Sequence, residues 1–277
     1  MYSIYHFFKN LAASKKYFLK TKDLQEFPYD LSLLSCRNKG TFPDMAIRIN
    51  SNKSTFTGGE LIELKDSNSY IVSSFNSTIP TGRKDVDKII TGQNSRIKQQ
   101  MIEAGNDIYS LPTREVFYLV RGKKHTITKV CLVHGSFFET IGVDKLINQA
   151  FSQVLEERLK ETGEHISDEL KAQLLDIFSK QDNFSKVRDV ERASVKIRFR
   201  IMTEVKAEGN ILNSKKYPEI KDNTLNFILP FHNQDEEKEH LEKMKIVFGE
   251  KNFNSFDSFK IKHHFNGYFL AFQILLR

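Results

Sequence analysis

The spacing of apolar residues changes along the first half of the chain. Over residues 2–19 apolar side chains recur at helical spacing, which predicts an amphipathic helix. From residue 42 the period shortens to two, because Met45, Ile47 and Ile49 alternate with polar or small residues as in a half-buried strand. The pattern then predicts two strands, over residues 56–65 and 70–75, and a helix over residues 83–104. Two more strands follow, over residues 115–120 and 126–134, and a basic turn at residues 121–124 joins them.

The second half of the chain predicts helices mixed with strands. An amphipathic pattern over residues 144–180 predicts two helices that meet near Gly163. The remaining segments predict two strands, a helix and a final strand, over residues 195–205, 224–231, 235–247 and 259–276.

The fold class expected from this order is α/β (α+β), with a central mixed sheet flanked by helices. We expect residues 1–140 to form the core and residues 141–277 to form a helical and β-strand extension. The alternative is that the second part adds strands and helices to the first sheet.

Composition makes this a globular protein with a preference for anionic partners. Of its 277 residues 39% are hydrophobic and 28% charged, which excludes a disordered chain. The 42 lysines and arginines exceed the 35 acidic residues, and the net charge of +7 favours partners such as nucleic acid.

Cysteine usage and hydropathy indicate the compartment. The two cysteines, Cys36 and Cys131, exclude a disulfide framework and a four-cysteine zinc site, and they suit a reducing cytoplasm. The longest apolar stretch, residues 268–276, is too short to span a bilayer, and the first residues carry no cleavage-like motif. We expect a soluble, cytoplasmic protein with no membrane partner.

Three charged residues near two of the predicted strands carry the candidate chemistry. Asp44 follows Pro43, and Glu63 and Lys65 flank Leu64 nineteen residues later. Side chains alternate along a strand, so Asp44 faces away from Met45, and Glu63 and Lys65 face away from Leu64. If the two strands are neighbours, the two carboxylates and the ammonium meet on one face of the sheet.

Such a group suits the hydrolysis of a phosphodiester. Two carboxylates bind Mg²⁺, which lowers the pKa of a bound water and withdraws charge from the phosphate, and a lysine orients the attacking water. Leu64 offers its backbone carbonyl to the same ion, while we expect its side chain in the core. Glu60 is a competing carboxylate, but it lies on the other face unless a bulge at Gly58–Gly59 shifts the register.

The motif Pro43-Asp44 with Glu63-Leu64-Lys65 resembles that of the PD-(D/E)XK nuclease superfamily, and within it the type II restriction endonucleases. The resemblance implies a restriction-endonuclease-like core of a helix, three strands, a helix and a strand over roughly residues 1–134. It also implies that Asp44 and Glu63 are metal ligands and Lys65 the catalytic lysine, with Glu26 as a third acid from the preceding helix. The alternative is that Asp44 opens a strand and that Glu63 and Lys65 are solvated strand residues.

Polar and basic residues elsewhere predict contacts with DNA. A hydroxyl- and amide-rich run after the motif is suited to gripping the phosphate backbone: Ser73, Ser74, Asn76, Ser77, Thr78, Arg83 and Lys84. Two further basic stretches and an amide-rich segment add contacts to the backbone and to base edges: Lys123, Arg198, Asn210, Asn213 and Lys215.

The function expected from these residues is a Mg²⁺-dependent type II restriction endonuclease. It would cut double-stranded DNA at a specific sequence as a homodimer, with a cognate DNA methyltransferase as genetic partner. Two alternatives stay open: a repair, junction-resolving or transposition nuclease of the same fold, and a DNA-binding protein without catalytic activity.

Overall fold

The computed structural model describes residues 42–47, 49, 58–72, 74–76, 79–89, 110–179 and 202–276, together with the backbone of β1 (Leu34–Ser35). The predicted N-terminal helix lies outside these residues, as do five residues of the predicted sites: Glu26, Ser73, Ser77, Thr78 and Arg198.

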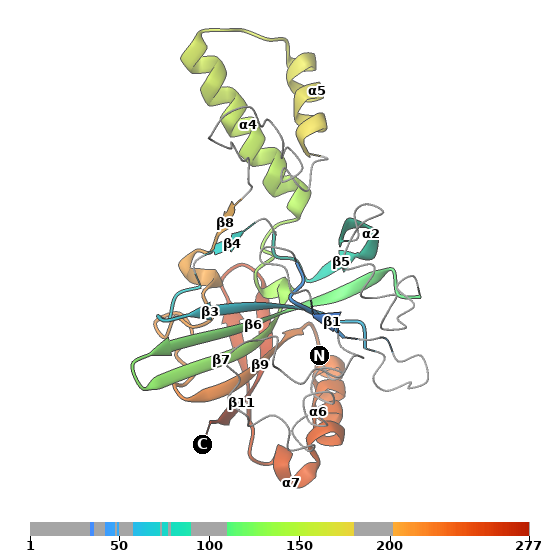
Figure 1. Cartoon of the computed structure of the whole chain (residues 1–277), viewed down its shortest axis with the longest axis vertical. Helices are drawn as coiled ribbons and strands as arrows, with labels where there is room; N and C mark the ends of the chain where they lie inside the picture. Colours follow the sequence, from blue (N-terminus) through green and yellow to red (C-terminus); the bar gives the residue numbers. More distant parts are fainter. Residues whose placement is uncertain are drawn as a thin grey trace. The chain divides into compact units, whose positions relative to one another are not determined.

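A mixed sheet forms the centre of the described chain (Figure 1). Its strands follow the order β1-β2-β3-β6-β7-β9-β11-β10, and the short β5 also pairs with β6. The pairs β3–β6 and β7–β9 are parallel, and the other neighbours are antiparallel. The bounds of the strands are β2 (Met45–Ala46), β3 (Leu61–Ser67), β5 (Arg83–Asp85), β6 (Thr113–Lys124), β7 (Ile127–His134), β9 (Thr224–Phe231), β10 (Asp257–His263) and β11 (Gly267–Leu275).

Two helices, α6 (Gln234–Phe248) and α7 (Glu250–Phe253), cover one face of this sheet. The Asn233 side chain caps α6 by accepting a hydrogen bond from the Glu236 N–H at 2.9 Å. The helices and strands share one apolar cluster: Ile47, Ile62, Phe117, Leu132, Phe227, Leu229, Met244, Val247, Phe253, Leu270 and Phe272. Each fully buried side chain of this size contributes about 1.5–3 kcal/mol, so this face is the principal core of the sheet.

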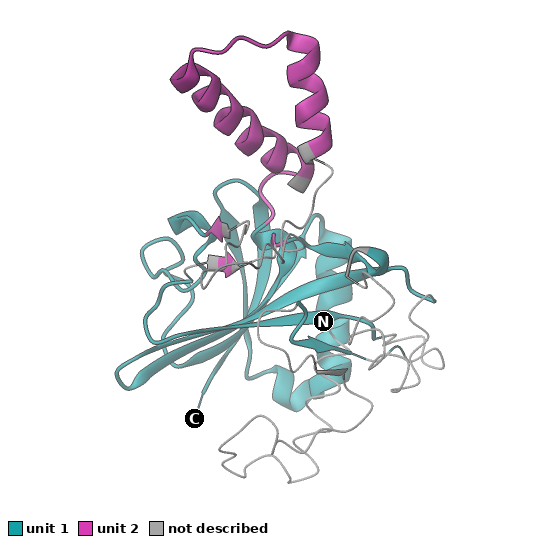
Figure 2. Ribbon diagram, turned by 45° about the horizontal axis from the view of Figure 1, so that its top comes forward, with its two compact units in different colours: residues 1–73, 81–138, 205–277 teal, residues 74–80, 139–204 magenta. Residues whose placement is uncertain are grey.

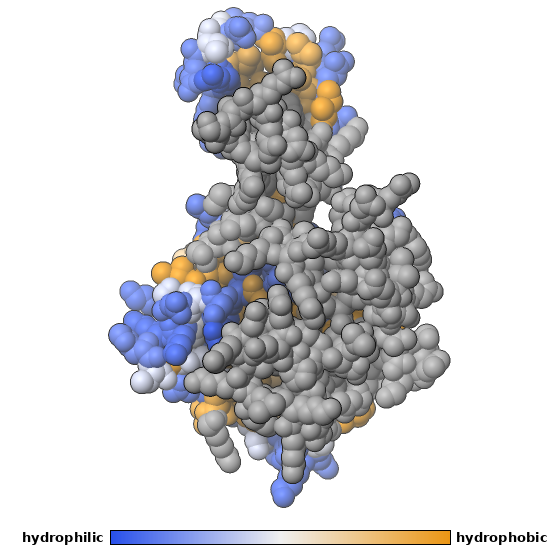
Figure 3. All heavy atoms as spheres, viewed as in Figure 1, coloured by the Kyte–Doolittle hydropathy of each residue, from blue (hydrophilic) through white to orange (hydrophobic). Residues whose placement is uncertain are grey.

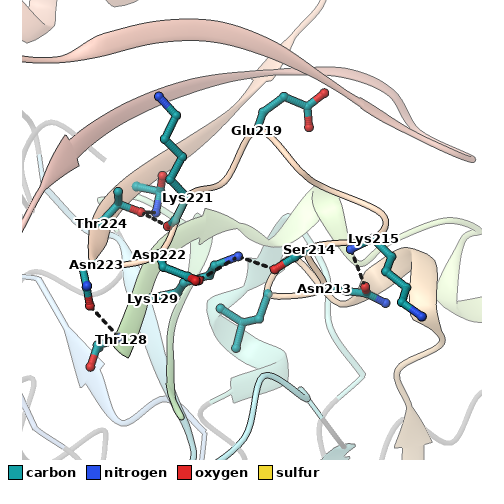
Figure 4. A network of polar contacts seen from close by, with 12 residues as sticks. Thr128, Lys129, Asn213, Ser214, Lys215, Glu219, Lys221, Asp222, Asn223 and Thr224 are labelled. Atoms are coloured by element: carbon teal, nitrogen blue, oxygen red, sulfur yellow. Dashed lines mark hydrogen bonds and ion pairs between the residues drawn. The ribbon is translucent and has the colours of Figure 1, made fainter. Parts of the chain in front are cut away.

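The segment before β9 covers part of the opposite face. Ile211, Leu212 and Tyr217 are buried there. On the same side the Lys129 ammonium, which is 1% exposed, lies 2.8 Å from the Ser214 hydroxyl and 3.5 Å from the Asp222 carboxylate (Figure 4). A buried ammonium needs such partners, and they fasten the segment to β7.

The chain divides into two compact units, and residues 74–80 and 139–204 form the second (Figure 2). Its helices α4 (Val143–Thr162) and α5 (Asp168–Ser179) pack against each other, and Lys171 pairs with Glu156 at 2.7 Å. Hydrophobic residues gather between the two helices, with hydrophilic residues outside them (Figure 3). The unit also contains a separate two-stranded sheet of β4 (Ser74–Asn76) and β8 (Met202–Glu204).

Most of the long predicted elements are confirmed. β7, β9 and α6 occupy the predicted segments to within a few residues. β6 contains the predicted strand 115–120, but it continues through residues 121–124, so the basic turn predicted there is wrong. The helix pair breaks as predicted at Gly163, whose φ of 69° is a left-handed conformation that suits glycine.

Three predictions of local structure are wrong in part. The predicted strand 70–75 does not join the central sheet, because β4 pairs with β8 instead. The predicted helix 83–104 begins with β5 instead, since β6 extends far enough to pair with it, and α2 (Val86–Ile89) follows. Residues 90–104 of this prediction lie outside the described residues. The segment 259–276, predicted as a single strand, belongs to the antiparallel hairpin β10–β11. The chain turns between the two strands, and Gly267 at the start of β11 has a φ of 75°.

The sheet also differs from the predicted division into 1–140 and 141–277. β9 pairs in parallel with β7, so strands from both halves complete one sheet. Most of the second unit, residues 139–204, is inserted between β7 and β9, and its residues 74–80 lie between β3 and β5 in the sequence. The arrangement follows the alternative in which the later strands extend the first sheet.

A glycine bulge sets the start of β3. Ile47 donates its N–H to the Glu60 carbonyl at 2.8 Å and accepts from the Gly59 N–H at 3.1 Å, so two residues oppose one. Gly59 has a φ of 93°, and an added Cβ would lie 2.8 Å from the Leu111 side chain. The bulge predicted from Gly58–Gly59 is therefore present. Glu60 precedes Glu63 by an odd number of residues, so alternation directs these carboxylates to opposite faces.

Replacing Gly59 should destabilise the protein. Gly59→Ala should lower the free energy of unfolding by about 1–3 kcal/mol, because alanine resists this φ and its methyl group meets Leu111. Urea denaturation followed by circular dichroism measures the loss. Gly142→Ala is the matched control, since nothing lies within 4 Å of its added Cβ. Equal stability of the two variants would show that the bulge tolerates a side chain.

Candidate active site

The structure brings Asp44, Glu63 and Lys65 together at the edge where β2 meets β3. The Asp44 Oδ2 atom accepts a hydrogen bond from the Leu64 N–H at 2.7 Å, across a separation of 20 residues. The Lys65 ammonium lies 2.9 Å from Glu63 Oε1. The Asp44 carboxylate is close enough to Glu63 to raise the pKa of that carboxyl. Two acids and one amine thus form a single polar group.

Strand register explains why they converge. β2 and β3 are antiparallel, with Met45 opposite Ile62. Ile62 belongs to the apolar cluster and Met45 packs against it, so the alternate positions Asp44 and Glu63 face the other side. The predicted pairing and facing of these strands are confirmed. The Leu64 side chain, in contrast, is 39% exposed and does not enter the core as predicted, because α6 and α7 cover the sheet only up to its neighbour Ile62.

The site is partly shielded from solvent, which changes the electrostatics of Glu63. Its side chain is only 12% exposed. Burial is the main cause that raises the pKa of the Glu63 carboxyl, the Lys65 ammonium opposes this, and Asp44 adds to it. The Glu63 Oε2 atom is buried and has no hydrogen-bond partner in the described part of the chain. A buried carboxylate oxygen in that state favours a cation as its partner.

The donor set fits a hard divalent cation. Carboxylate and carbonyl oxygens are the ligands of Mg²⁺ in proteins. Asp44 and Glu63 supply the first type. The N–H and C=O of one strand residue project to the same edge, so the Leu64 carbonyl points toward the edge that its N–H shares with Asp44. Among the described residues no group of three or more histidine, cysteine, aspartate or glutamate side chains could hold a metal, so two acids and a carbonyl are what this site offers.

A neighbouring acid on the same strand has a different role. Asp66 is the register partner of Arg121 on β6, and the Arg121 Nε atom donates to its Oδ1 atom at 2.7 Å. This hydrogen bond lowers the pKa of Asp66 below its usual range. Alternation places Asp66 on the face opposite to Glu63 and Lys65. Asp66 is therefore an exposed ion-pair residue outside the site.

The two basic residues predicted at the end of the polar run lie on different faces. Lys84 is half-buried, and its ammonium lies 5.0 Å from the centre of the Phe42 ring. Arg83 is exposed and lies 3.7 Å from Glu115, its register partner on β6. The structure therefore does not bring Arg83 to the site, because residues next to each other in a strand face opposite sides.

Asn210 requires a correction. It was expected to read base edges, but it is 7% exposed and its side chain is occupied. Its amide donates to the Tyr70 carbonyl at 2.9 Å and accepts from Leu212 N–H at 3.2 Å and Val72 N–H at 3.4 Å. These bonds hold the chain that leaves β3 against the segment before β9. The amide satisfies buried backbone groups, a role that the amino-acid sequence does not reveal.

The other predicted DNA contacts are spread over the surface. Lys123 is exposed near the end of β6, and Lys215 is exposed beside Asn213, whose Oδ1 atom accepts from the Lys215 N–H at 3.0 Å (Figure 4). Ser74 and Asn76 lie in β4 of the second unit.

Two features of the site were missed from sequence. The sequence pattern assigns no partner to Phe42, whose ring contacts the Lys84 ammonium. Tyr118 was read only as part of a strand, yet it is buried and is the register partner of Glu63 on the parallel strand β6. Its position depends on which strand pairs with β3, and sequence spacing carries no signal of that.

Comparisons of the sequence with protein-family models and with characterised proteins, and of the structure with solved structures, found no match. The helices of the described residues include none that is long and apolar enough to cross a membrane.

Asp44 has a structural contribution that can be separated from its charge. Asp44→Ala removes the acceptor for the Leu64 N–H and should lower the free energy of unfolding by about 1 kcal/mol. Asp44→Asn keeps an acceptor oxygen and should stay within about 0.5 kcal/mol of the native protein. Urea denaturation in the presence of EDTA measures both. If alanine is as well tolerated as asparagine, the hydrogen bond contributes nothing to stability.

Proposed function

We propose that this protein is a Mg²⁺-dependent endonuclease that hydrolyses phosphodiester bonds of double-stranded DNA, of the type II restriction kind. The observation that carries the proposal is the convergence of Asp44, Glu63 and Lys65 on neighbouring strands. The burial of the Glu63 carboxylate beside Asp44 supports it, because a buried carboxylate close to a second acid favours a cation as its partner.

The chemistry proposed for this group divides between the residues. Asp44, Glu63 and the Leu64 carbonyl hold the metal ion, which when bound acidifies water and withdraws charge from the phosphate. Glu63 must be deprotonated to act as a ligand. Lys65, which pairs with Glu63 at 2.9 Å, then turns its ammonium toward the attacking water and the developing negative charge on the phosphate.

The partners proposed follow from this chemistry and from charge. A net charge of +7 favours a polyanion, and the exposed Lys123 and Lys215 are basic residues that can contact its backbone. Cleavage of both strands at a symmetric sequence suits a homodimer. A cognate DNA methyltransferase encoded nearby would be the genetic partner of such an enzyme.

Cleavage of phage DNA with Mg²⁺ tests the proposal. Discrete fragments are expected for the native protein, whereas Asp44→Asn, Glu63→Gln and Lys65→Ala should each reduce cutting by at least about 100-fold, the scale of one catalytic group. The matched control is Asp66→Asn, an acid on the same strand but the other face, which should cut normally. Smears or preferential cutting of branched DNA would favour a repair or junction-resolving nuclease. Intact DNA under all metal conditions would exclude the enzyme.

Metal binding should depend on pH because of Glu63. Its raised pKa means that the metal-free carboxyl retains its proton to a higher pH than an ordinary glutamate, so Mg²⁺ binding must displace it. The affinity should fall as the pH is lowered through this raised pKa. Calorimetric titration in two buffers of different ionisation enthalpy should show proton release in the native protein and in Asp66→Asn. Equal heats in both buffers would contradict a role for a protonated Glu63.

A further inference from the structure

Side chains alternate between the two faces of β5, so only one of the adjacent residues Arg83 and Lys84 lies on the face of the candidate site. β5 pairs with β6 so that Arg83 opposes Glu115 and Lys84 opposes Arg114 (Figure 1). Register partners share a face of a sheet, and so do alternate residues of one strand. Lys84 is therefore on the face of Arg114 and Tyr118, and Arg83 is on the opposite one.

That face is the one that carries the acids. Tyr118 is the register partner of Glu63 in the parallel pair β3–β6. Glu115 and Arg83 instead lie on the same face of the sheet as Phe117, which belongs to the apolar cluster under α6 and α7. Arg83 and Lys84 are thus adjacent basic residues that lie on opposite faces of the sheet.

A ring contact joins Lys84 to the chain segment that carries Asp44. The Nζ atom lies 5.0 Å from the centre of the Phe42 ring. Phe42 is two residues before Asp44, and two peptide units span at most about 7.6 Å between Cα atoms. Lys84 is half-buried against this ring, so its side chain has fewer conformations open to it than that of an exposed lysine.

We propose that Lys84 binds a backbone phosphate of DNA beside the one that is cut, and that Arg83 does not. The inference rests on the proposed function, because it assigns the substrate contact of that site. An ammonium held on the same face as the two carboxylates offsets part of their negative charge, which would otherwise repel the DNA backbone. Contacts of this kind position the strand and carry no sequence information.

Binding measured without cleavage tests the inference. Fluorescence anisotropy of a fluorescein-labelled mixed-sequence duplex is followed with Ca²⁺ in place of Mg²⁺, since Ca²⁺ takes the same oxygen ligands. Lys84→Ala should weaken binding by roughly tenfold, the factor of one charge-assisted hydrogen bond. It should also reduce the slope of log affinity against log salt by about 1. Lys84→Arg should keep most of both, and Arg83→Ala should bind like the native protein.

The outcomes separate the inference from the proposed function. If the native protein cuts DNA but Lys84→Ala and Arg83→Ala bind equally well, the role of Lys84 is excluded and the nuclease stands. If the native protein binds but never cuts, while only Lys84→Ala loses affinity, the phosphate contact stands and the nuclease does not. A loss in Lys84→Ala that Lys84→Arg shares in full would point to packing against Phe42 and overturn the phosphate contact.

Discussion

The pairing of β2 with β3 is the interaction on which the candidate site depends. β2 is short, and the Asp44 carboxylate extends the pairing by accepting the Leu64 N–H at 2.7 Å. The same carboxylate is thereby held beside Glu63. One hydrogen bond thus has two consequences, since it satisfies a strand edge and assembles two acids at one point. The Gly59 bulge at the other end of the pair sets the register that makes this possible.

The two faces of the sheet differ in what covers them. One is apolar and packs under α6 and α7, where the core cluster lies. The other also buries apolar side chains, such as Leu61 and Tyr118, but it carries polar groups with partners among them: Glu63 with Lys65, and Lys129 with Ser214 and Asp222. A shift of one residue in β3 would turn Glu63 and Lys65 toward the principal core and Ile62 away from it.

Burial connects the geometry of the site to its chemistry. Burial raises the pKa of a carboxyl group and favours a cation close to it. The Glu63 carboxyl has a raised pKa, and its buried Oε2 atom accepts no hydrogen bond from the described residues. Lys65 supplies one positive charge, which leaves a net charge of −1 on the three side chains when both acids are ionised. A divalent ion bound by the carboxylate oxygens would more than offset that charge and leave a positive centre for a phosphate.

The amino-acid sequence determined the features that depend on local spacing. Alternation placed Asp44, Glu63 and Lys65 on one face, two glycines marked a bulge, and apolar periodicity located β6, β7, β9 and the helices α4 to α6. Only the tertiary structure decided which strands are neighbours. It joined β9 to β7, turned Asn210 inward to Tyr70 and Val72, and put Lys84 rather than Arg83 on the face of Glu63. The physical reason is that alternation follows from the geometry of a single chain segment. Pairing depends instead on backbone hydrogen bonds and buried surfaces between segments up to 140 residues apart, as Asn210 and Tyr70 are.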